Sequence, residues 1–272
     1  MKKKDFKEEC AVSSDSAADG ASVITEVKTA TVIQKDVVCD NLLTQAIYRI
    51  VFCVISGLAC LLSLGYFEQV FGADKFTISN NFWQFYTNLS NYYCFGIGIA
   101  VCASTIKKLR RGESRGYNTC APTLKFCGVV MIMVTFLVYS CLLGDLGSPA
   151  YWTSLGNLSY HVVAPILFIV DFFIFDKHKQ VKILDPVKAT FMPLGYVVYI
   201  LIYGAICRAA NLNFEYPYFF LNVDKLGYGG VIGWVAILVV VFVAVGYLLF
   251  LYDKLVKKDG KWKLDFTNLK LW

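Results

Sequence analysis

Five polar side chains gather at the start of a long apolar segment that runs from about residue 82 to residue 106. They are Gln84, Thr87, Asn88, Ser90 and Asn91. All but Ser90 follow the spacing i, i+3, i+4 and i+7, which places them on one face of a helix. The segment is long enough to cross a bilayer, where polar side chains are costly unless they face protein or a wet cavity. We therefore expect this face to meet a polar partner inside a helical bundle.

His161 is the candidate partner, because it opens a later apolar segment and an ionisable residue inside a membrane span indicates a functional site. Pro165 lacks the N–H that would bond to the carbonyl of His161, so the helix should loosen or kink there. At about 1.5 Å per residue, Thr87 lies about 7 Å and His161 about 6 Å inside their respective spans. The two side chains should therefore lie at a similar depth, if both spans start at the same face of the membrane.

A threonine hydroxyl beside a neutral imidazole can perform acyl transfer. The hydroxyl is a poor nucleophile until a base removes its proton, and imidazole does so near neutral pH. Asn88, Asn91 or Gln84 could orient the imidazole or donate a hydrogen bond to an oxyanion. The alternative is a hydrogen bond between Thr87 and His161 that only satisfies two buried polar groups.

The other ionisable residues near the spans are predicted to have structural roles. His178 lies in a basic loop and should be solvated. Arg49 should extend to the lipid headgroups. Asp171 lies about 15 Å deeper than His161, too far to join it directly, and should cap a helix near the inner interface or pair with a lysine of the loop between the fourth and fifth spans. Arg208 could bind a carboxylate or phosphate group or anchor its helix at the interface.

The sequence does not point to metal or nucleotide chemistry. The sequence contains no HExxH, CxxC, phosphate-binding loop or paired-carboxylate motif, so we predict no metal and no cofactor. Its ten cysteines lack metal-ligand spacing, and we expect them to be free thiols that pack as small apolar residues.

The composition predicts an all-α, multi-pass membrane protein. Of the 272 residues, 57% are hydrophobic and 17% are charged, whereas soluble domains have about a quarter charged residues. We expect residues 41–255 to form a single bundle of six transmembrane helices, between a disordered polar tail over residues 1–40 and a basic tail over residues 256–272. A regulatory or partner-binding arm is the alternative for the first tail. The predicted spans are 42–65, 82–106, 124–143, 157–175, 189–207 and 231–252.

Basic residues are concentrated in alternate loops, with sixteen in one set and three in the other. By the positive-inside rule, both termini of this integral membrane protein face the cytoplasm, and we expect the cell membrane as its location. Thr87 and His161 then both lie near the outer face. Membrane topology therefore explains the +6 net charge of the chain. We expect membrane lipids as partners and no nucleic acid. The sixteen are Lys107, Lys108, Arg110, Arg111, Arg115, Lys125, Lys177, Lys179, Lys182, Lys188, Lys254, Lys257, Lys258, Lys261, Lys263 and Lys270, and the three are Lys75, Arg208 and Lys225.

The outer loop over residues 208–230 is aromatic and contains Tyr216-Pro217-Tyr218-Phe219-Phe220. Tyr and Phe suit the membrane interface, so we expect an aromatic belt there. A packed cap over the mouth of the bundle is the alternative.

Three short motifs give the chain a family resemblance. They are Tyr86-Thr87-Asn88-Leu89-Ser90-Asn91, Tyr160-His161-Val162-Val163-Ala164-Pro165 followed by Asp171, and Tyr216-Pro217-Tyr218-Phe219-Phe220-Leu221-Asn222-Val223. With them, residues 42–255 resemble the FAR-17a/androgen-induced-protein-like superfamily, in its prokaryotic branch of six-span membrane proteins. Animal members hydrolyse fatty-acid esters of hydroxy fatty acids with an intramembrane threonine and histidine and no metal. The resemblance implies that Thr87 and His161 hold these positions here.

We therefore expect an intramembrane lipid-ester hydrolase, with Thr87 as nucleophile, His161 as base and then acid, and Asn88, Asn91 or Gln84 in support. The alternative is a non-enzymatic membrane protein, either a small-solute transporter or a scaffold. Charged residues near the midplane or broken helices would favour a transporter.

Overall fold

The computed structural model describes residues 37–64, 82–118, 120–144, 147–153, 155–258 and 262–264. Every described residue belongs to the unit Val32–Trp272. Most of the tail predicted over residues 1–40 therefore lies outside the described residues. The described residues include six helical segments long and apolar enough to cross a membrane, which agrees with the predicted all-α fold. They are Leu42–Ser63, Tyr86–Arg110, Pro122–Leu143, Gly156–Phe175, Asp185–Ala209 and Val223–Leu255.

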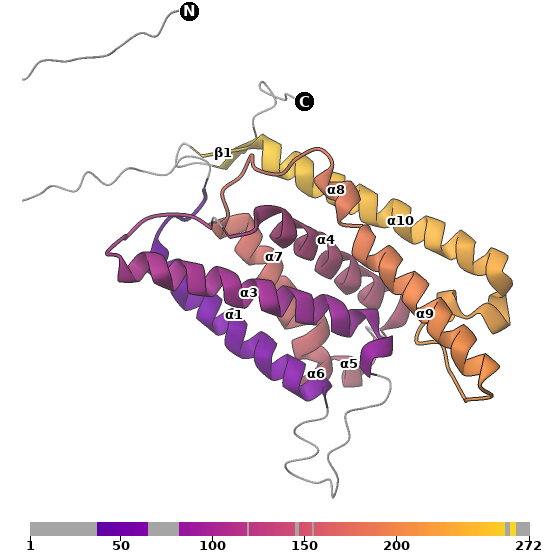
Figure 1. Ribbon diagram of the computed structural model, residues 1–272. Coiled ribbons are helices and arrows are strands. Elements are labelled where there is room, and N and C mark those ends of the chain that lie inside the picture. The colour runs from indigo at the N-terminus through magenta and orange to yellow at the C-terminus, as the bar shows by residue number, and fades with distance from the viewer. Residues whose placement is uncertain are drawn as a thin grey trace, which may run out of the picture. The chain divides into compact units, whose positions relative to one another are not determined.

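Several of these spans are built from more than one helical element (Figure 1). The long helices are α1 (Leu42–Ser63), α3 (Tyr86–Arg110), α4 (Pro122–Val138), α7 (Ala164–Phe175), α9 (Phe191–Ala209) and α10 (Val223–Leu255). The short elements are η1 (Phe82–Gln84), η2 (Tyr139–Leu143), α5 (Pro149–Thr153), α6 (Leu155–Leu158), η3 (Ser159–Val163), α8 (Asp185–Lys188) and η4 (Phe219–Leu221). After α10, β1 (Val256–Lys258) and β2 (Trp262–Leu264) pair antiparallel within the predicted basic tail.

Local sequence explains where the helices begin. The Asn41 side chain accepts a hydrogen bond from the Thr44 amide at 3.0 Å and caps α1, as expected for asparagine at this position. Asn222 caps α10 in the same way, accepting from the Lys225 amide at 3.0 Å. This cap places the start of α10 at Val223, eight residues before the predicted start, and Gly227 interrupts the helix there with a φ of +64°.

The helix that carries His161 is loosened at the predicted place. Residues Ser159–Val163 form a π-helical turn, and the Ala164 amide donates to the Ser159 carbonyl, five residues back. Pro165 follows directly and has no N–H with which to bond the His161 carbonyl. A second π-helical turn, Tyr139–Leu143, ends the preceding span. Such turns occur mostly as single interruptions and often at functional sites.

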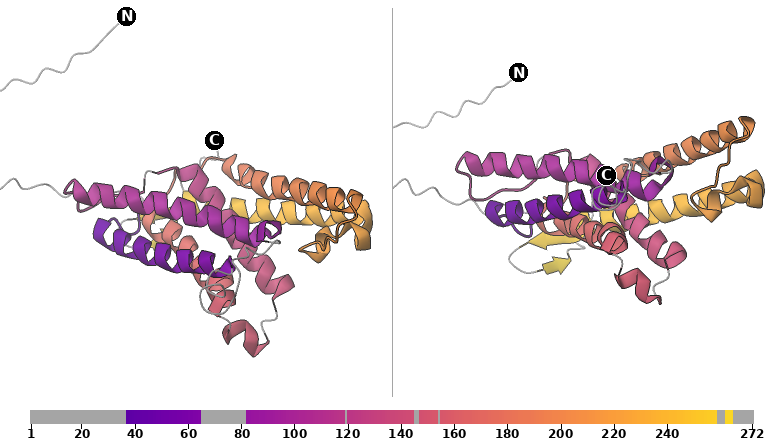
Figure 2. Two further views of the ribbon diagram at one scale, coloured as in Figure 1. Left: turned by 60° about the horizontal axis from the view of Figure 1, so that its bottom comes forward. Right: turned by 90° about the horizontal axis from the view of Figure 1, so that it is seen from below.

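The core of the bundle forms where small residues let helices approach one another. Helices α1 and α3 lie side by side, as Figures 1 and 2 both show. At Gly98 of α3, an added Cβ atom would collide with the ring of Phe52 from α1. Phe168 of α7 packs on Phe52 with ring centroids 5.5 Å apart. Close packing over small residues is how membrane helices associate without a hydrophobic driving force.

The connections define two ends of the bundle. At one end, the Leu42 amide donates to the Ser114 carbonyl, and the start of α4 holds Lys125; we call this the Lys125 end. At the other end, which we call the Thr87 end, the Tyr160 hydroxyl donates to the Asn88 carbonyl at 3.4 Å. The first turn of α3 and the π-helical turn with His161 therefore lie at the same end and depth.

Candidate functional site

Thr87 lies in the first turn of α3, where it contacts a tyrosine from a distant part of the chain. The Thr87 amide donates to the phenol oxygen of Tyr218 at 3.2 Å. The Thr87 hydroxyl oxygen lies 3.3 Å from the same phenol oxygen. Both residues are 7% exposed, so the contact is buried. Amides in the first turn of a helix have no partner within the helix, and Tyr218 satisfies this one.

The other polar residues of this stretch also face the protein interior. Ser90 is fully buried, and its hydroxyl lies 3.1 Å from the Thr135 hydroxyl of α4. Asn91 is 2% exposed, and its side-chain amide donates to the Thr87 carbonyl at 2.9 Å. Thr87 and Asn91 of the predicted polar face are therefore buried in protein, and so is Ser90, which lies off that face.

Gln84 is buried as expected but lies outside the helix, and Asn88 is less buried than expected. Gln84 belongs to η1, before α3 begins, so it does not continue the helical face. Its backbone carbonyl accepts a hydrogen bond from the Tyr196 hydroxyl at 2.5 Å. Asn88 is only partly buried, and its backbone carbonyl is the acceptor for Tyr160. These contacts position the start of α3 against α9 and η3.

His161 packs against aromatic rings. Its imidazole stacks on the ring of Tyr139, with centroids 3.5 Å apart and planes 7° from parallel. The ring of Tyr160 meets it edge-on at 5.8 Å. The Nδ1 atom of His161 is buried and has no hydrogen-bond partner among the described residues. Within that part of the chain, no hydrogen bond joins His161 to Thr87, whose hydroxyl contacts Tyr218 instead.

A cavity of about 70 Å³ opens beside Thr87, between α3, α4, α9 and α10. Thr87, Tyr218 and Tyr139 line it together with apolar side chains from α4, α9 and α10. The apolar lining includes Val134, Val138, Leu194, Val197, Leu238, Val239 and Phe242. Tyr139 therefore contacts His161 and also borders the cavity that Thr87 lines. This lining suits an acyl chain, with a few polar groups to fix its orientation.

Tyr218 is the functional candidate that the sequence did not single out. The aromatic loop around it was expected to form an interfacial belt, but Tyr218, Phe220 and Leu221 are 7%, 5% and 1% exposed. They pack with Tyr196 and Ile200 of α9 in one apolar cluster. This segment is therefore the packed cap that was the alternative. Burial raises the pKa of Tyr218, so its phenol keeps its proton at neutral pH.

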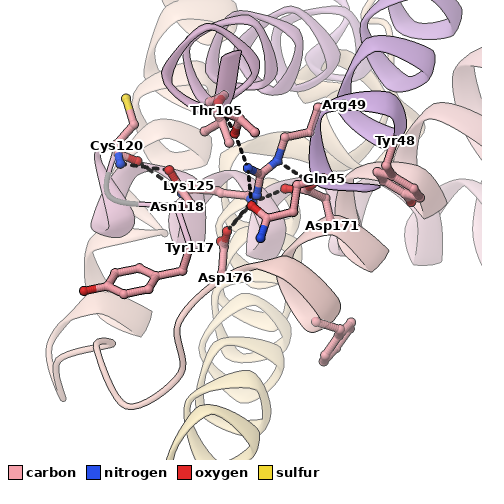
Figure 3. Close-up of polar contacts among 12 residues, drawn as sticks. Gln45, Tyr48, Arg49, Thr105, Tyr117, Asn118, Cys120, Lys125, Asp171 and Asp176 are labelled. Carbon is pink, nitrogen blue, oxygen red and sulfur yellow. Dashed lines mark hydrogen bonds and ion pairs between the residues drawn. The ribbon is translucent and has the colours of Figure 1, made fainter. Parts of the chain in front are cut away.

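Four ionisable side chains form a buried network at the Lys125 end (Figure 3). Arg49 and Lys125 are each 1% exposed. The Arg49 Nε atom donates to Asp171 Oδ1 at 2.9 Å, and Lys125 bonds to the other oxygen of that carboxylate. Lys125 Nζ also lies 2.6 Å from Asp176 Oδ1. Gln45 completes the cluster by accepting from Arg49 Nη1 at 3.0 Å.

This network corrects three predictions. Arg49 does not reach the headgroups, because its guanidinium pairs with Asp171 inside the bundle. Lys125, assigned to a cytosolic loop, is part of the buried start of α4. Asp171 pairs with these two cations rather than with a lysine of the loop that follows α7. Each desolvated charge needs a partner, and here each carboxylate receives at least one cation.

The expected role of His178 also changes, whereas Arg208 pairs with a carboxylate of the chain itself. His178 is 1% exposed and not solvated. Its Nε2 lies 3.1 Å from the Phe173 carbonyl, and its Nδ1 lies 3.5 Å from Asp253 Oδ1 at the end of α10. Arg208 is paired on the surface, with its Nη2 2.5 Å from Asp224 Oδ1. This ion pair makes Arg208 a surface anchor between α9 and α10. The nine cysteines within the described ranges are free thiols.

Comparison of the chain with known protein families, with curated proteins and with solved structures finds no match.

Proposed function

We propose that this chain is an intramembrane lipid-ester hydrolase with Thr87 as its nucleophile. The observation that carries the proposal is the position of the Thr87 hydroxyl, which is held by Tyr218 at the wall of an apolar cavity within the bundle. A nucleophile in this setting meets an ester whose acyl chain fills the cavity. The family resemblance of the three motifs supports the same residue.

The reaction is a two-step acyl transfer. The Thr87 oxygen bonds to the carbonyl carbon of the ester, and the carbonyl π electrons move to the carbonyl oxygen. The proton of Thr87 passes to a base. As the tetrahedral intermediate collapses, the bond to the alcohol breaks and the alcohol takes up that proton. Water then hydrolyses the acyl-threonine by the same steps and releases the fatty acid.

His161 is the base in this proposal. Its Nδ1 atom is buried without a hydrogen-bond partner among the described residues, and its ring stacks on Tyr139, which borders the cavity. A base can act directly or through one bridging water, and catalytic contacts are often looser in the free enzyme. We assign the proton transfer from Thr87 to His161 to such a bridged path. Neutral imidazole accepts the proton and later returns it to the leaving alcohol.

The proposed substrate is a membrane lipid ester, including fatty-acid esters of hydroxy fatty acids. The side chains around the cavity come mostly from valine, leucine and aromatic residues, which favours a hydrocarbon chain. The charge asymmetry of the sequence supports an orientation with the Thr87 end outward and both termini in the cytoplasm. The substrate would then enter laterally from the outer leaflet of the cell membrane, and no cofactor is required.

Ester hydrolysis by the purified full-length protein in detergent tests this function. Thr87→Ala and His161→Ala should each lose at least about 10²-fold of the wild-type rate. Thr153→Ala is the matched control, because its side chain is exposed on helix α5 and its hydroxyl donates to the Pro149 carbonyl. Wild-type rates in folded Thr87→Ala protein would overturn the proposal.

One observation favours the non-enzymatic alternative of a transporter, namely the buried charged side chains around Asp171. Ionisable residues within membrane spans often mark ion pathways. These four side chains, however, pair with one another, and the cavity beside Thr87 has an apolar lining. We therefore place the hydrolase first.

A further inference from the structure

The phenol oxygen of Tyr218 contacts both the amide nitrogen and the hydroxyl oxygen of Thr87. This oxygen accepts the Thr87 amide hydrogen at 3.2 Å. A phenol also has one hydrogen to donate, and the Thr87 hydroxyl oxygen lies 3.3 Å away. If Tyr218 donates to this oxygen, the hydroxyl hydrogen of Thr87 is left to point toward a base. In that arrangement the Thr87 hydroxyl is ready for deprotonation.

The surrounding aromatic rings hold this phenol in place. Its ring stacks on Phe220 with centroids 5.1 Å apart and planes 3° from parallel. Phe85, directly before α3, packs edge-on at 6.2 Å, and Tyr196 of α9 lies at 6.3 Å. Donors fixed in advance in a water-poor site stabilise a developing charge without the cost of reorientation. Tyr218 meets this condition through its packing.

We infer that Tyr218 is a catalytic residue whose hydroxyl, with the Thr87 amide, stabilises the oxyanion formed during ester cleavage; this inference rests on the proposed function. When the Thr87 oxygen bonds to the carbonyl carbon, the π electrons of the C=O bond move to the carbonyl oxygen and the Thr87 proton moves to His161. The new oxyanion is bonded to the same carbon as the Thr87 oxygen. Tyr218 transfers its hydrogen bond from the Thr87 oxygen to this neighbouring oxyanion.

The amide N–H of Thr87 supports the same assignment. It lies in the first turn of the 25-residue helix α3, where the helix dipole favours negative charge. Its hydrogen-bond partner in this structure is the Tyr218 oxygen, so this N–H can also donate to a substrate oxygen that lies beside the Tyr218 hydroxyl. Asn91 was a predicted oxyanion donor, but its side-chain amide donates to the Thr87 carbonyl. Tyr218 is therefore better placed for this role than Asn91.

Steady-state hydrolysis of a p-nitrophenyl ester and its thionoester by the purified full-length protein tests the inference. Tyr218→Phe should lower kcat for the ester by about 10²-fold, the effect of removing one oxyanion donor, with little change in KM. Sulfur accepts hydrogen bonds poorly, so the thionoester should show a smaller difference between wild type and Tyr218→Phe. Tyr93→Phe is the control, since its hydroxyl donates to the Leu124 carbonyl and does not border the cavity.

The outcomes separate the inference from the proposed function. An active wild type and an equally active, folded Tyr218→Phe would overturn the role of Tyr218 alone. An equal rate loss on both substrates would also overturn it, because that pattern indicates a structural effect. If Tyr218→Phe does not fold, Tyr218 can be replaced by 3-fluorotyrosine, which keeps the shape of the side chain and makes its hydroxyl a stronger hydrogen-bond donor. The rate of ester hydrolysis should then rise. An unchanged rate would contradict the inference. An inactive wild type would overturn the proposed function itself.

Discussion

The phenol oxygen of Tyr218 lies within 3.3 Å of both the amide nitrogen and the hydroxyl oxygen of Thr87. This contact joins the first turn of α3 to the segment between α9 and α10, 131 residues further along the chain. It fixes the direction of the Thr87 side chain at the wall of the cavity. The proposed chemistry depends on this placement.

Narrowing the cavity should change which acyl chains are accepted. Val239 of α10 lines the cavity, and Val239→Phe adds volume where a long chain would lie. We expect hydrolysis of long-chain esters to fall by about tenfold or more, while acetyl esters are cleaved at the wild-type rate. Rates across a series of ester chain lengths measure this effect.

Val240 provides the matched control for that series. It is the next residue of α10 and is 67% exposed on the bundle, so Val240→Phe should place its ring outside. The chain-length profile of Val240→Phe should match the wild type. Identical profiles for both variants would contradict the location of the acyl site.

Removing one charge from the buried network should destabilise the bundle. Asp171→Asn leaves Arg49 and Lys125 without their shared carboxylate. Breaking a buried pair in this way costs about 3–5 kcal/mol, and we expect a clearly lower melting temperature in detergent. Thermal unfolding followed by intrinsic fluorescence measures the change.

Asp224→Asn is the comparison variant for the buried network. Asp224 pairs with Arg208 at the surface, where its side chain is 57% exposed. Exposed pairs contribute little, so its melting temperature should stay at the wild-type value. If Asp171→Asn proved as stable as Asp224→Asn, the network would not stabilise the fold.

The contact between α1 and α3 should not tolerate a larger residue at Gly98. An added methyl group would meet the buried ring of Phe52, and such overpacking costs about 1–3 kcal/mol. Gly98→Ala should lower the melting temperature. Gly96→Ala, two residues earlier on α3, has no atom within 4 Å of the new methyl group and should unfold like the wild type. Equal melting temperatures would refute this packing.

The spans could be predicted because apolar length alone determines them. The runs that begin near residues 42 and 157 were placed within two residues of both observed ends. The loosening of the helix at His161 could also be predicted, because Pro165 cannot donate to its carbonyl. Hydropathy does not reveal a helix start that a polar cap determines. Asn222 caps α10, and the predicted start of this helix lies eight residues after the observed start.

The partners of the polar side chains could not be predicted in the same way. Hydropathy places Arg49 near a membrane boundary, but only the packing of α1 against α7 brings it to Asp171. His178 follows a basic pattern, yet it is buried because the loop after α7 packs against Asp253 of α10. Tyr218 lies in an aromatic stretch that suits an interface equally well. Its contact with Thr87 depends on how the loop folds back over the bundle.

Mass spectrometry of the protein after reaction with a fluorophosphonate probe tests Thr87 as the nucleophile. We expect one covalent adduct on the Thr87 side chain in the wild type, and no adduct in Thr87→Ala protein that remains folded. Labelling of a different residue, or equal labelling of the wild type and Thr87→Ala, would contradict Thr87 as the nucleophile.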